Sequence, residues 1–207
     1  MSAPIQYRGG ITREQWLMTE MRTVARLMLD ERITEEKQIV EHIVANNSFQ
    51  YPTERSLGSI ARACARRLNG LSEDASTRQR LQELIAHGLP DQAAQANLYA
   101  MIRDNRILWD FAATVLAAKT RTCDAHLTRS EISTFLESLR TQDERIATWS
   151  DATLNKIRIV ITRCLAQCRR YDRKTQTLLP LSIDPVLEAA ITANGDKAVL
   201  PAFGFEG

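Results

Sequence analysis

The stretch "AAQANLYAMIRDNRILWDFAATVLAAK", residues 93–119, decides the fold class of this 207-residue chain. Its second half is apolar almost all round, a pattern typical of a helix buried at the centre of a helical protein. A break in this helix is expected near Asp104 and Asn105. Alternation of apolar and polar residues persists nowhere long enough to build a sheet. The sequence therefore predicts an all-α, compact multi-helix globular fold.

The segment "GLPD" (88–91) is the best candidate for a boundary between two lobes, because glycine and proline interrupt the helical pattern there. We expect an N-terminal helical lobe at 1–88 and a C-terminal helical lobe at 89–207, sharing one globular body. The N-terminal lobe is predicted to contain one helix-turn-helix-like element that ends in a basic helix. The connection before the first basic helix is longer than the motif usually has.

The segment "PTERSLGSIARACARRLNG" (52–70) predicts the first basic helix, with Thr53 as its N-cap. At about 100° per residue, the predicted inner face consists of Leu57, Ile60, Ala61, Cys64 and Leu68. The predicted outer face consists of Arg55, Ser59, Arg62 and Arg66. Arginines at this spacing suit phosphate oxygens or a guanine edge, and no carboxylate follows Glu54 to balance them. The alternative is a face that carries charge only for solvation.

A second basic segment spans residues 151–174, although the net charge of the whole chain is only +2. Seven basic residues against two aspartates give this segment a local charge of +5. Two such clusters in an otherwise balanced chain indicate acidic partners at defined places.

Ser150 is expected to cap the helix of this segment, which should run to about Arg170. Its predicted inner stripe consists of Leu154, Ile157, Ile161, Cys164, Leu165 and Cys168. The residues predicted to face outward are Asn155, Lys156, Ile159, Thr162, Arg163 and Arg170. Asparagine, threonine, lysine and arginine together can contact both base edges and phosphates. An ordinary solvated helix surface is the alternative.

Nothing in the sequence indicates catalysis or a cofactor. There is no G-x-S-x-G, phosphate loop, nucleotide-binding glycine triplet or H-E-x-x-H motif, and the three histidines are scattered. Cys123 and His126 resemble half of a zinc site, but Cys164 and Cys168 are spaced like buried neighbours on a helix. We therefore expect a protein that is not an enzyme and that holds no cofactor or metal.

The location of the protein is indicated by features that the sequence lacks. The opening "MSAPIQYRGG" has no apolar core of a signal peptide, and no apolar run reaches the roughly 18–20 residues that span a membrane. Four cysteines without a secretory signal are typical of reduced thiols. We expect a cytoplasmic protein without membrane contact, and a monomer.

Four segments taken in order resemble the BrxA family of the bacteriophage-exclusion (BREX) systems: "ANNSFQYPTERSLGSIARACARRLNGL" (45–71), "NRILWDFAATVLAAK" (105–119), "WSDATLNKIRIVITRCLAQCRRYD" (149–172) and "LLPLSIDPVLEAAI" (178–191). The resemblance covers most of the chain from Thr12 onward. It depends on the order and spacing of Asn46, Asn47, Ser56, Arg67, Leu68, Phe111, Trp149, Thr153 and Lys156.

This resemblance implies a small all-helical cytoplasmic bacterial protein without known enzymatic activity, encoded beside a methyltransferase, an ATPase and a phosphatase-like protein that would be its partners. It also implies binding of double-stranded DNA through helix-turn-helix-like elements, one in each half. A distant similarity to the RNA-binding antitermination fold keeps RNA as a less favoured ligand. The resemblance supplies no catalytic residue.

Two hypotheses follow for the basic helices. In the first, Arg55, Arg62 and Arg66 of one lobe and Lys156, Arg163 and Arg170 of the other neutralise DNA phosphates, while Ser59, Asn155 and Thr162 approach base edges. In the second, the same basic faces dock acidic patches of other defence subunits, and the protein is an adaptor.

Overall fold

The computed structural model describes residues 6–204, and the chain divides into two compact units. One unit comprises Leu17–Ala100, and the other comprises Met1–Trp16 together with Met101–Gly207. Helices dominate both units, and within the described residues the strands form a single two-stranded sheet. The predicted all-α fold is confirmed, while the predicted lobes at 1–88 and 89–207 and their helix-turn-helix-like elements stay predictions.

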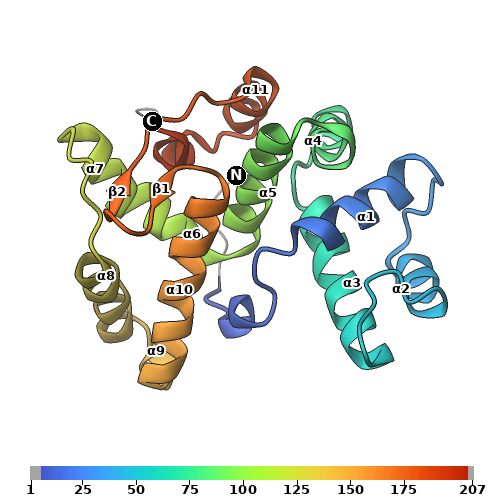
Figure 1. Ribbon diagram of the computed structural model, residues 1–207, viewed down its shortest axis with the longest axis horizontal. Helices are drawn as coiled ribbons and strands as arrows, with labels where there is room; N and C mark the ends of the chain where they lie inside the picture. Colours follow the sequence, from blue (N-terminus) through green and yellow to red (C-terminus); the bar gives the residue numbers. More distant parts are fainter. Residues whose placement is uncertain (1–5, 205–207) are drawn as a thin grey trace. The chain divides into compact units, whose positions relative to one another are not determined.

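The first unit, called here the α1–α4 unit, is built from four helices and the start of a fifth (Figure 1). These are α1 (Met18–Leu29), α2 (Glu36–Ala45), α3 (Glu54–Asn69), α4 (Ala75–His87) and the start of α5 (Pro90–Asp104). Helix α3 packs against α1 and α2, and α1 also packs against α4. Helix α3 is therefore a common packing partner of α1 and α2.

Two arginines of α1 complete the C-terminal end of α4. Arg22 donates from Nε to the carbonyl of Ile85 at 3.0 Å and from Nη2 to that of Gly88 at 3.1 Å. Arg26 donates from Nε to the carbonyl of Ala86 at 3.1 Å. The last carbonyls of a helix lack partners within the helix, and cations are favourable at that end. These contacts fix α1 against α4.

The second unit, called the α6–α11 unit, holds the remaining elements. They are the 3-10 helix η1 (Gly9–Thr12), α6 (Arg106–Asp110), the π-helix η2 (Phe111–Leu116), α7 (Ala117–Arg121), α8 (Arg129–Gln142), α9 (Glu144–Ala147), α10 (Asp151–Gln167), β1 (Tyr171–Asp172), β2 (Thr177–Leu178), α11 (Pro185–Ala193) and the 3-10 helix η3 (Lys197–Phe203). Strands β1 and β2 pair antiparallel, with Tyr171 opposite Leu178.

The break predicted near Asp104 and Asn105 is confirmed. Helix α5 ends at Asp104, and the side-chain oxygen of Asn105 accepts from the backbone N–H of Ile107 at 3.0 Å to cap α6. The amide nitrogen of Asn105 donates to the carbonyl of Arg8 at 3.1 Å. The Asn105 side chain thus closes a helix and holds the N-terminal segment at the same time.

The core of the α6–α11 unit contains one buried ion pair among its apolar side chains. Arg103 donates from Nη1 to Oδ2 of Asp196, and their side chains are 6% and 0% exposed. Phe111 and Phe203 of the same unit are 2% and 0% exposed. Throughout residues 6–204, no helix has the length and apolar character needed to cross a lipid bilayer.

Candidate nucleic-acid interface

Helix α3 has the two faces that its sequence predicts. Thr53 caps it by accepting from the backbone N–H of Ser56 at 3.2 Å, as predicted. The predicted inner residues are buried: Leu57, Ile60, Ala61, Cys64 and Leu68. Arg55, Ser59 and Arg62 are exposed, and Arg66 is half-buried. Neither Arg55 nor Arg62 forms an ion pair with any carboxylate in residues 6–204. The outer face of α3 is thus a cationic line in contact with solvent.

The predicted inner stripe of helix α10 is buried, and three of its five candidate contact residues are exposed to solvent. The inner residues are all buried: Leu154, Ile157, Ile161, Cys164, Leu165 and Cys168. Asn155, Lys156 and Arg163 are exposed. Arg163 donates from Nη1 to the side-chain oxygen of Gln15, which follows η1. Lys156 and Arg163 lie two helical turns apart, on a line that differs from the one through Asn155.

The outward orientation predicted for Thr162 is wrong. Its residue is only 7% exposed, and its hydroxyl donates to carbonyls of the preceding turn, those of Arg158 and Ile159. Helix α10 packs against α8, β1 and η1, so more than one of its sides is covered. A helical period locates an inner stripe but does not show how far neighbouring elements extend around the helix.

The outward orientation predicted for Arg170 is also wrong. Helix α10 ends at Gln167, and Arg169 has a positive φ of 56°, so Arg170 no longer follows the helical period. Its residue is 7% exposed, and its guanidinium donates from Nη1 to the carbonyl of Leu179. Burial lowers the pKa of Arg170, as expected when a cation leaves water. A buried guanidinium is in no position to neutralise a phosphate on the surface.

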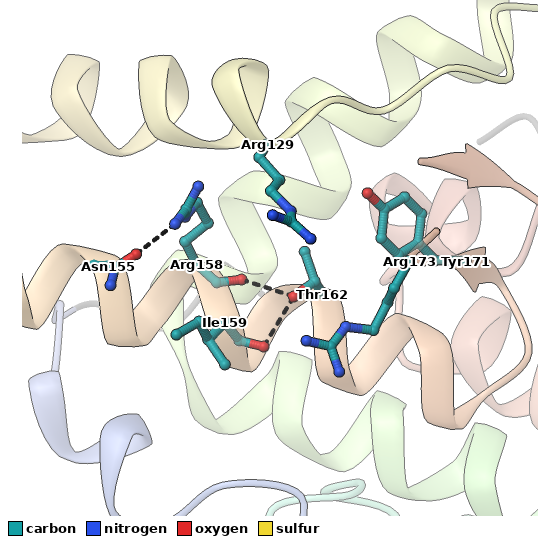
Figure 2. A pocket seen from close by; sticks show the side chains of 7 residues that line it. All are labelled: Arg129, Asn155, Arg158, Ile159, Thr162, Tyr171 and Arg173. Carbon is teal, nitrogen blue, oxygen red and sulfur yellow. Dashed lines mark hydrogen bonds between the residues drawn. The ribbon is translucent and has the colours of Figure 1, made fainter. Parts of the chain in front are cut away.

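A pocket of about 240 Å³ opens beside α10 (Figure 2). Its lining residues are Arg129, Asn155, Arg158, Ile159, Thr162, Tyr171 and Arg173. Arg129 is the first residue of α8, Tyr171 lies on β1, and Arg173 lies in the turn between β1 and β2. Two of the predicted site residues, Asn155 and Thr162, are therefore walls of a cationic pocket.

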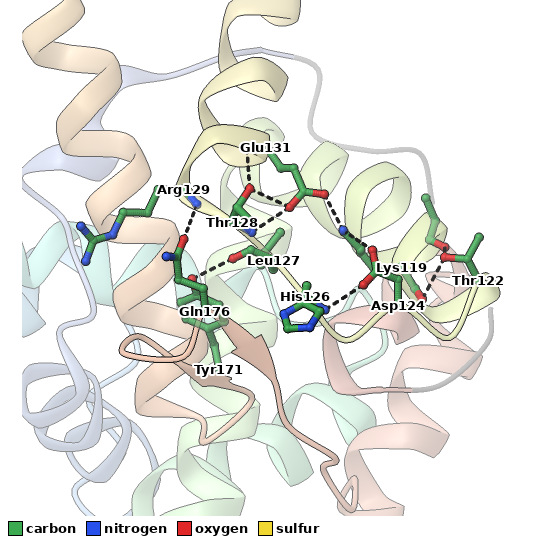
Figure 3. A network of polar contacts seen from close by, with 11 residues as sticks. Lys119, Thr122, Asp124, His126, Leu127, Thr128, Arg129, Glu131, Tyr171 and Gln176 are labelled. Carbon is green, nitrogen blue, oxygen red and sulfur yellow. Dashed lines mark hydrogen bonds and ion pairs between the residues drawn. The ribbon is translucent and has the colours of Figure 1, made fainter.

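A network of polar contacts holds the segment before α8 against the β1–β2 hairpin (Figure 3). The Tyr171 hydroxyl donates to the carbonyl of Leu127 at 2.8 Å, and the Leu127 N–H donates to the carbonyl of Gln176 at 2.9 Å. The side-chain oxygen of Gln176 accepts from the backbone N–H of Arg129 at 2.9 Å. Burial raises the pKa of Tyr171, so its hydroxyl stays protonated and available as a donor. This network fixes the backbone that carries Arg129.

The start of α8 is held from its other side by Lys119 of α7. Thr128 and Glu131 form a capping box, with the Thr128 oxygen accepting from the Glu131 N–H at 3.1 Å. The Lys119 ammonium, 12% exposed, donates to Glu131 and to Oδ2 of Asp124, the latter at 2.6 Å. The hydrogen bond from Lys119 lowers the pKa of Asp124. Burial alone would raise the pKa of Glu131, but hydrogen bonds from Lys119 and Thr128 lower it.

These shifts predict a loss of stability in acid. A carboxyl group whose pKa is lower in the folded state stabilises the fold above its unfolded pKa, and that stabilisation is lost as the pH falls through the folded pKa. The urea midpoint of the α6–α11 unit should therefore decrease as the pH is lowered from about 5 to 3, and Lys119→Met should make this decrease shallower. Lys156→Met, which changes an exposed lysine of the same unit, should leave the pH profile unchanged. Parallel profiles for Lys119→Met and the wild type would contradict the assignment.

The three arginines of the pocket were not among the site residues predicted from the sequence: Arg129, Arg158 and Arg173. Arg129 lies 22 residues before the start of α10 in the chain, and only folding brings it to the pocket. The position of Arg129 in the sequence could have indicated a functional role. An arginine at the first position of a helix is electrostatically unfavourable, because it lies at the positive end of the helix dipole. A residue type that is unfavourable for the local structure indicates a role beyond that structure.

The thiols and acidic groups of the described residues form no recognisable metal centre. Residues 6–204 contain no group of three or more histidine, cysteine, aspartate or glutamate side chains arranged to hold a metal ion. All four cysteines are free thiols, and the Cys164 thiol lies 3.7 Å from the sulfur of Met101 in the core. The chemistry of the candidate surfaces is therefore that of arginine, lysine and neutral polar side chains.

Comparison with known proteins identifies the family. Residues 5–195 match the BrxA family model. A BREX protein BrxA from Bacillus cereus (strain H3081.97) is 28% identical over 159 residues, which are 77% of this chain and 76% of that protein. A BREX protein BrxA from Paramagnetospirillum magneticum (strain ATCC 700264 / AMB-1) is 26% identical over 196 residues, 94% of each chain.

A solved structure has a similar fold. The crystal structure of an uncharacterized protein from Magnetospirillum magneticum matches with a TM-score of 0.77 and 25% sequence identity, over 95% of this chain and 97% of that one. The family suggested by the four sequence segments is thereby confirmed, and the chain belongs to the BrxA family of the BREX phage-defence systems.

Proposed function

We propose that this chain is a non-enzymatic component of its BREX system that binds double-stranded DNA through basic helices. The observation that carries the proposal is the outer face of α3, where Arg55, Ser59 and Arg62 are exposed at positions i, i+4 and i+7. Residues 55 and 62 are about 10 Å apart along the helix axis. A helix fits the major groove of B-DNA, with guanidinium groups on phosphates or on a guanine edge.

The absence of compensating charge on this face favours binding over simple solvation. A helix surface that serves only solubility usually mixes charges at i, i+4, because opposite charges there add a little stability. Helix α3 instead carries Glu54 at its start and no carboxylate afterwards. Arg55 and Arg62 thus repel each other weakly without benefit to the fold, which is expected where a polyanion binds.

The α6–α11 unit offers a second cationic surface, with Lys156 and Arg163 exposed on α10. Two of the predicted contact residues, Thr162 and Arg170, are buried and are not part of this surface. Few side chains of either surface are placed to read bases, so we expect a weak preference for sequence and a strong dependence on salt.

The test is fluorescence anisotropy with a labelled duplex and the purified full-length chain, at salt concentrations from 50 to 200 mM. Each neutralised phosphate contributes about −0.9 to the slope of log K against log salt. The variant Arg55→Ala/Arg62→Ala should therefore make the slope shallower by about 1.8 and weaken binding. Arg80→Ala, at an exposed arginine on α4, is the control and should behave as the wild type.

Two results would contradict the proposal: an affinity for duplex that does not change with salt, or a double variant that binds as the wild type does. A single-stranded RNA of the same length should bind more weakly than the duplex. If the purified chain ignored DNA but other BREX proteins were recovered with it after nuclease treatment, the adaptor hypothesis would replace this one.

A further inference from the structure

The pocket beside α10 combines three cations with no anion. Its lining contains Arg129, Arg158 and Arg173 and not a single carboxylate. These arginines come from the start of α8, from α10 and from the β1–β2 turn. In Figure 2 the side chains of Arg129 and Arg173 extend toward Thr162 from different elements. The fold has thus gathered three positive charges from three separate segments around one small volume.

None of the three arginines forms an ion pair within residues 6–204. Arg106 and Arg140 of the same unit, by contrast, contact Asp110 at 2.7 Å and Asp151 at 2.8 Å. Convergent like charges destabilise a fold through mutual repulsion, and an anion that binds among them removes this repulsion. The pocket therefore has the charge arrangement of an anion site.

The other lining groups complete such a site. Arg158 donates from Nη2 to the side-chain oxygen of Asn155, so the amide nitrogen of Asn155 remains available as a donor. The start of α8 adds the positive end of a helix dipole beside Arg129. The Tyr171 hydroxyl is engaged with Leu127, so the tyrosine contributes its ring rather than a donor. Donors and positive charge dominate, as a tetrahedral oxyanion requires.

The neighbouring pocket differs from the cationic pocket because carboxylates are among its lining residues. This second pocket, of about 200 Å³, shares Asn155 and Arg158 but is also lined by Glu137 and Asp151. Both carboxylates contact Arg140, at 3.5 and 2.8 Å, so the positive charge without a carboxylate partner lies on the side of Arg129 and Arg173. At about 240 Å³, the cationic pocket is smaller than the range of about 300–1,000 Å³ that holds drug-sized ligands. Its size suits a compact anion.

We propose that this pocket is a binding site for a phosphate group, held by the guanidinium groups of Arg129 and Arg173 with help from Arg158 and Asn155. Guanidinium forks match phosphate oxygens in pairs, and arginine is the side chain best suited to this recognition. The phosphate comes from a small phosphomonoester such as a nucleotide or from the backbone of a nucleic acid. The site contains no residue of α3 and does not depend on DNA binding by that helix.

The test is isothermal titration calorimetry of the full-length chain with inorganic phosphate and with deoxyadenosine monophosphate, at low ionic strength in a buffer free of other oxyanions. Saturable binding to one site is expected. Arg129→Ala and Arg173→Ala should each weaken it by about tenfold or more, since each removes a charge-assisted contact. Arg121→Ala, at an exposed arginine on α7, is the matched control and should leave binding unchanged. Thermal melting curves verify that each variant is folded.

A wild type without saturable phosphate binding would overturn the proposal, and so would equal losses in Arg129→Ala and Arg121→Ala. Competition by an unlabelled duplex identifies the source. Phosphate binding that the duplex displaces assigns the site to a nucleic-acid backbone, and tighter binding of the mononucleotide without displacement assigns it to a small molecule. The α3 variant Arg55→Ala/Arg62→Ala should keep its phosphate binding whether or not it loses DNA, so the two proposals fail separately.

Discussion

Replacing Asp196 with alanine should lower the free energy of unfolding of the α6–α11 unit by about 3–5 kcal/mol. The substitution leaves the Arg103 guanidinium in the core without its carboxylate, because the side chains of this pair are 6% and 0% exposed. Removing one partner of a buried pair leaves a charge without compensation, and this is far less favourable than loss of an exposed pair. Urea denaturation followed by tryptophan fluorescence measures the effect. All three tryptophans, Trp16, Trp109 and Trp149, belong to this unit.

The control for Asp196→Ala is an ion pair on the surface. Lys37 and Glu41 lie 3.8 Å apart on α2 with side chains 87% and 64% exposed, and Glu41→Ala should change stability by no more than about 0.5 kcal/mol. Helix α2 lies in the α1–α4 unit, which contains no tryptophan. The unfolding of this unit is therefore followed by circular dichroism instead of fluorescence. If Asp196→Ala were no more destabilising than Glu41→Ala, burial of the ion pair would have no energetic consequence.

Features that depend on neighbouring residues were predictable from the sequence. Thr53 and Ser150 cap the helices they were expected to cap. A capping side chain contacts a backbone N–H two or three residues away, so the sequence contains both partners within one window. The break at Asn105 follows from the same local chemistry.

Features that depend on distant partners were not predictable. Arg103 and Asp196 are 93 residues apart, and nothing in either segment indicates the other. The β1–β2 hairpin has only two residues in each strand, too few for an alternating pattern to appear. Tertiary contacts hold both features in place. His126, for example, forms an isolated antiparallel bridge with Thr177.

In the candidate site, too, local features were predictable from the sequence and long-range features were not. Helical periodicity correctly located the buried faces of α3 and α10, because the inner stripe of a helix is encoded in its own sequence. It placed Thr162 and Arg170 incorrectly, since α10 is covered by several neighbours and ends before residue 170. The cationic pocket needs Arg129 from α8 and Arg173 from the hairpin turn. A helical-wheel projection of α10 alone includes neither Arg129 nor Arg173.

Replacing Phe111 with alanine should lower the free energy of unfolding of the α6–α11 unit by about 3–5 kcal/mol. The ring lies in the π-helix η2, is 2% exposed, and meets the ring of Phe135 edge-on, with centroids 5.3 Å apart and an interplanar angle of 66°. Truncation leaves a cavity and removes an aromatic contact worth about 0.5–1.5 kcal/mol beyond the buried area. Tryptophan fluorescence in urea again measures the change.

Smaller substitutions separate the two contributions. Phe111→Leu keeps most of the volume and should be destabilising by under about 1.5 kcal/mol, whereas Val186→Ala, at a side chain 41% exposed, should stay within about 0.5 kcal/mol. A double-mutant cycle of Phe111→Leu and Phe135→Leu should give a coupling energy near 1 kcal/mol, and additive effects would show that the rings only fill space.

Phe135 lies on α8, the helix that begins at Arg129. The capping box and Lys119 hold that start independently, so the folded fraction of Phe111→Ala should still bind phosphate with wild-type affinity.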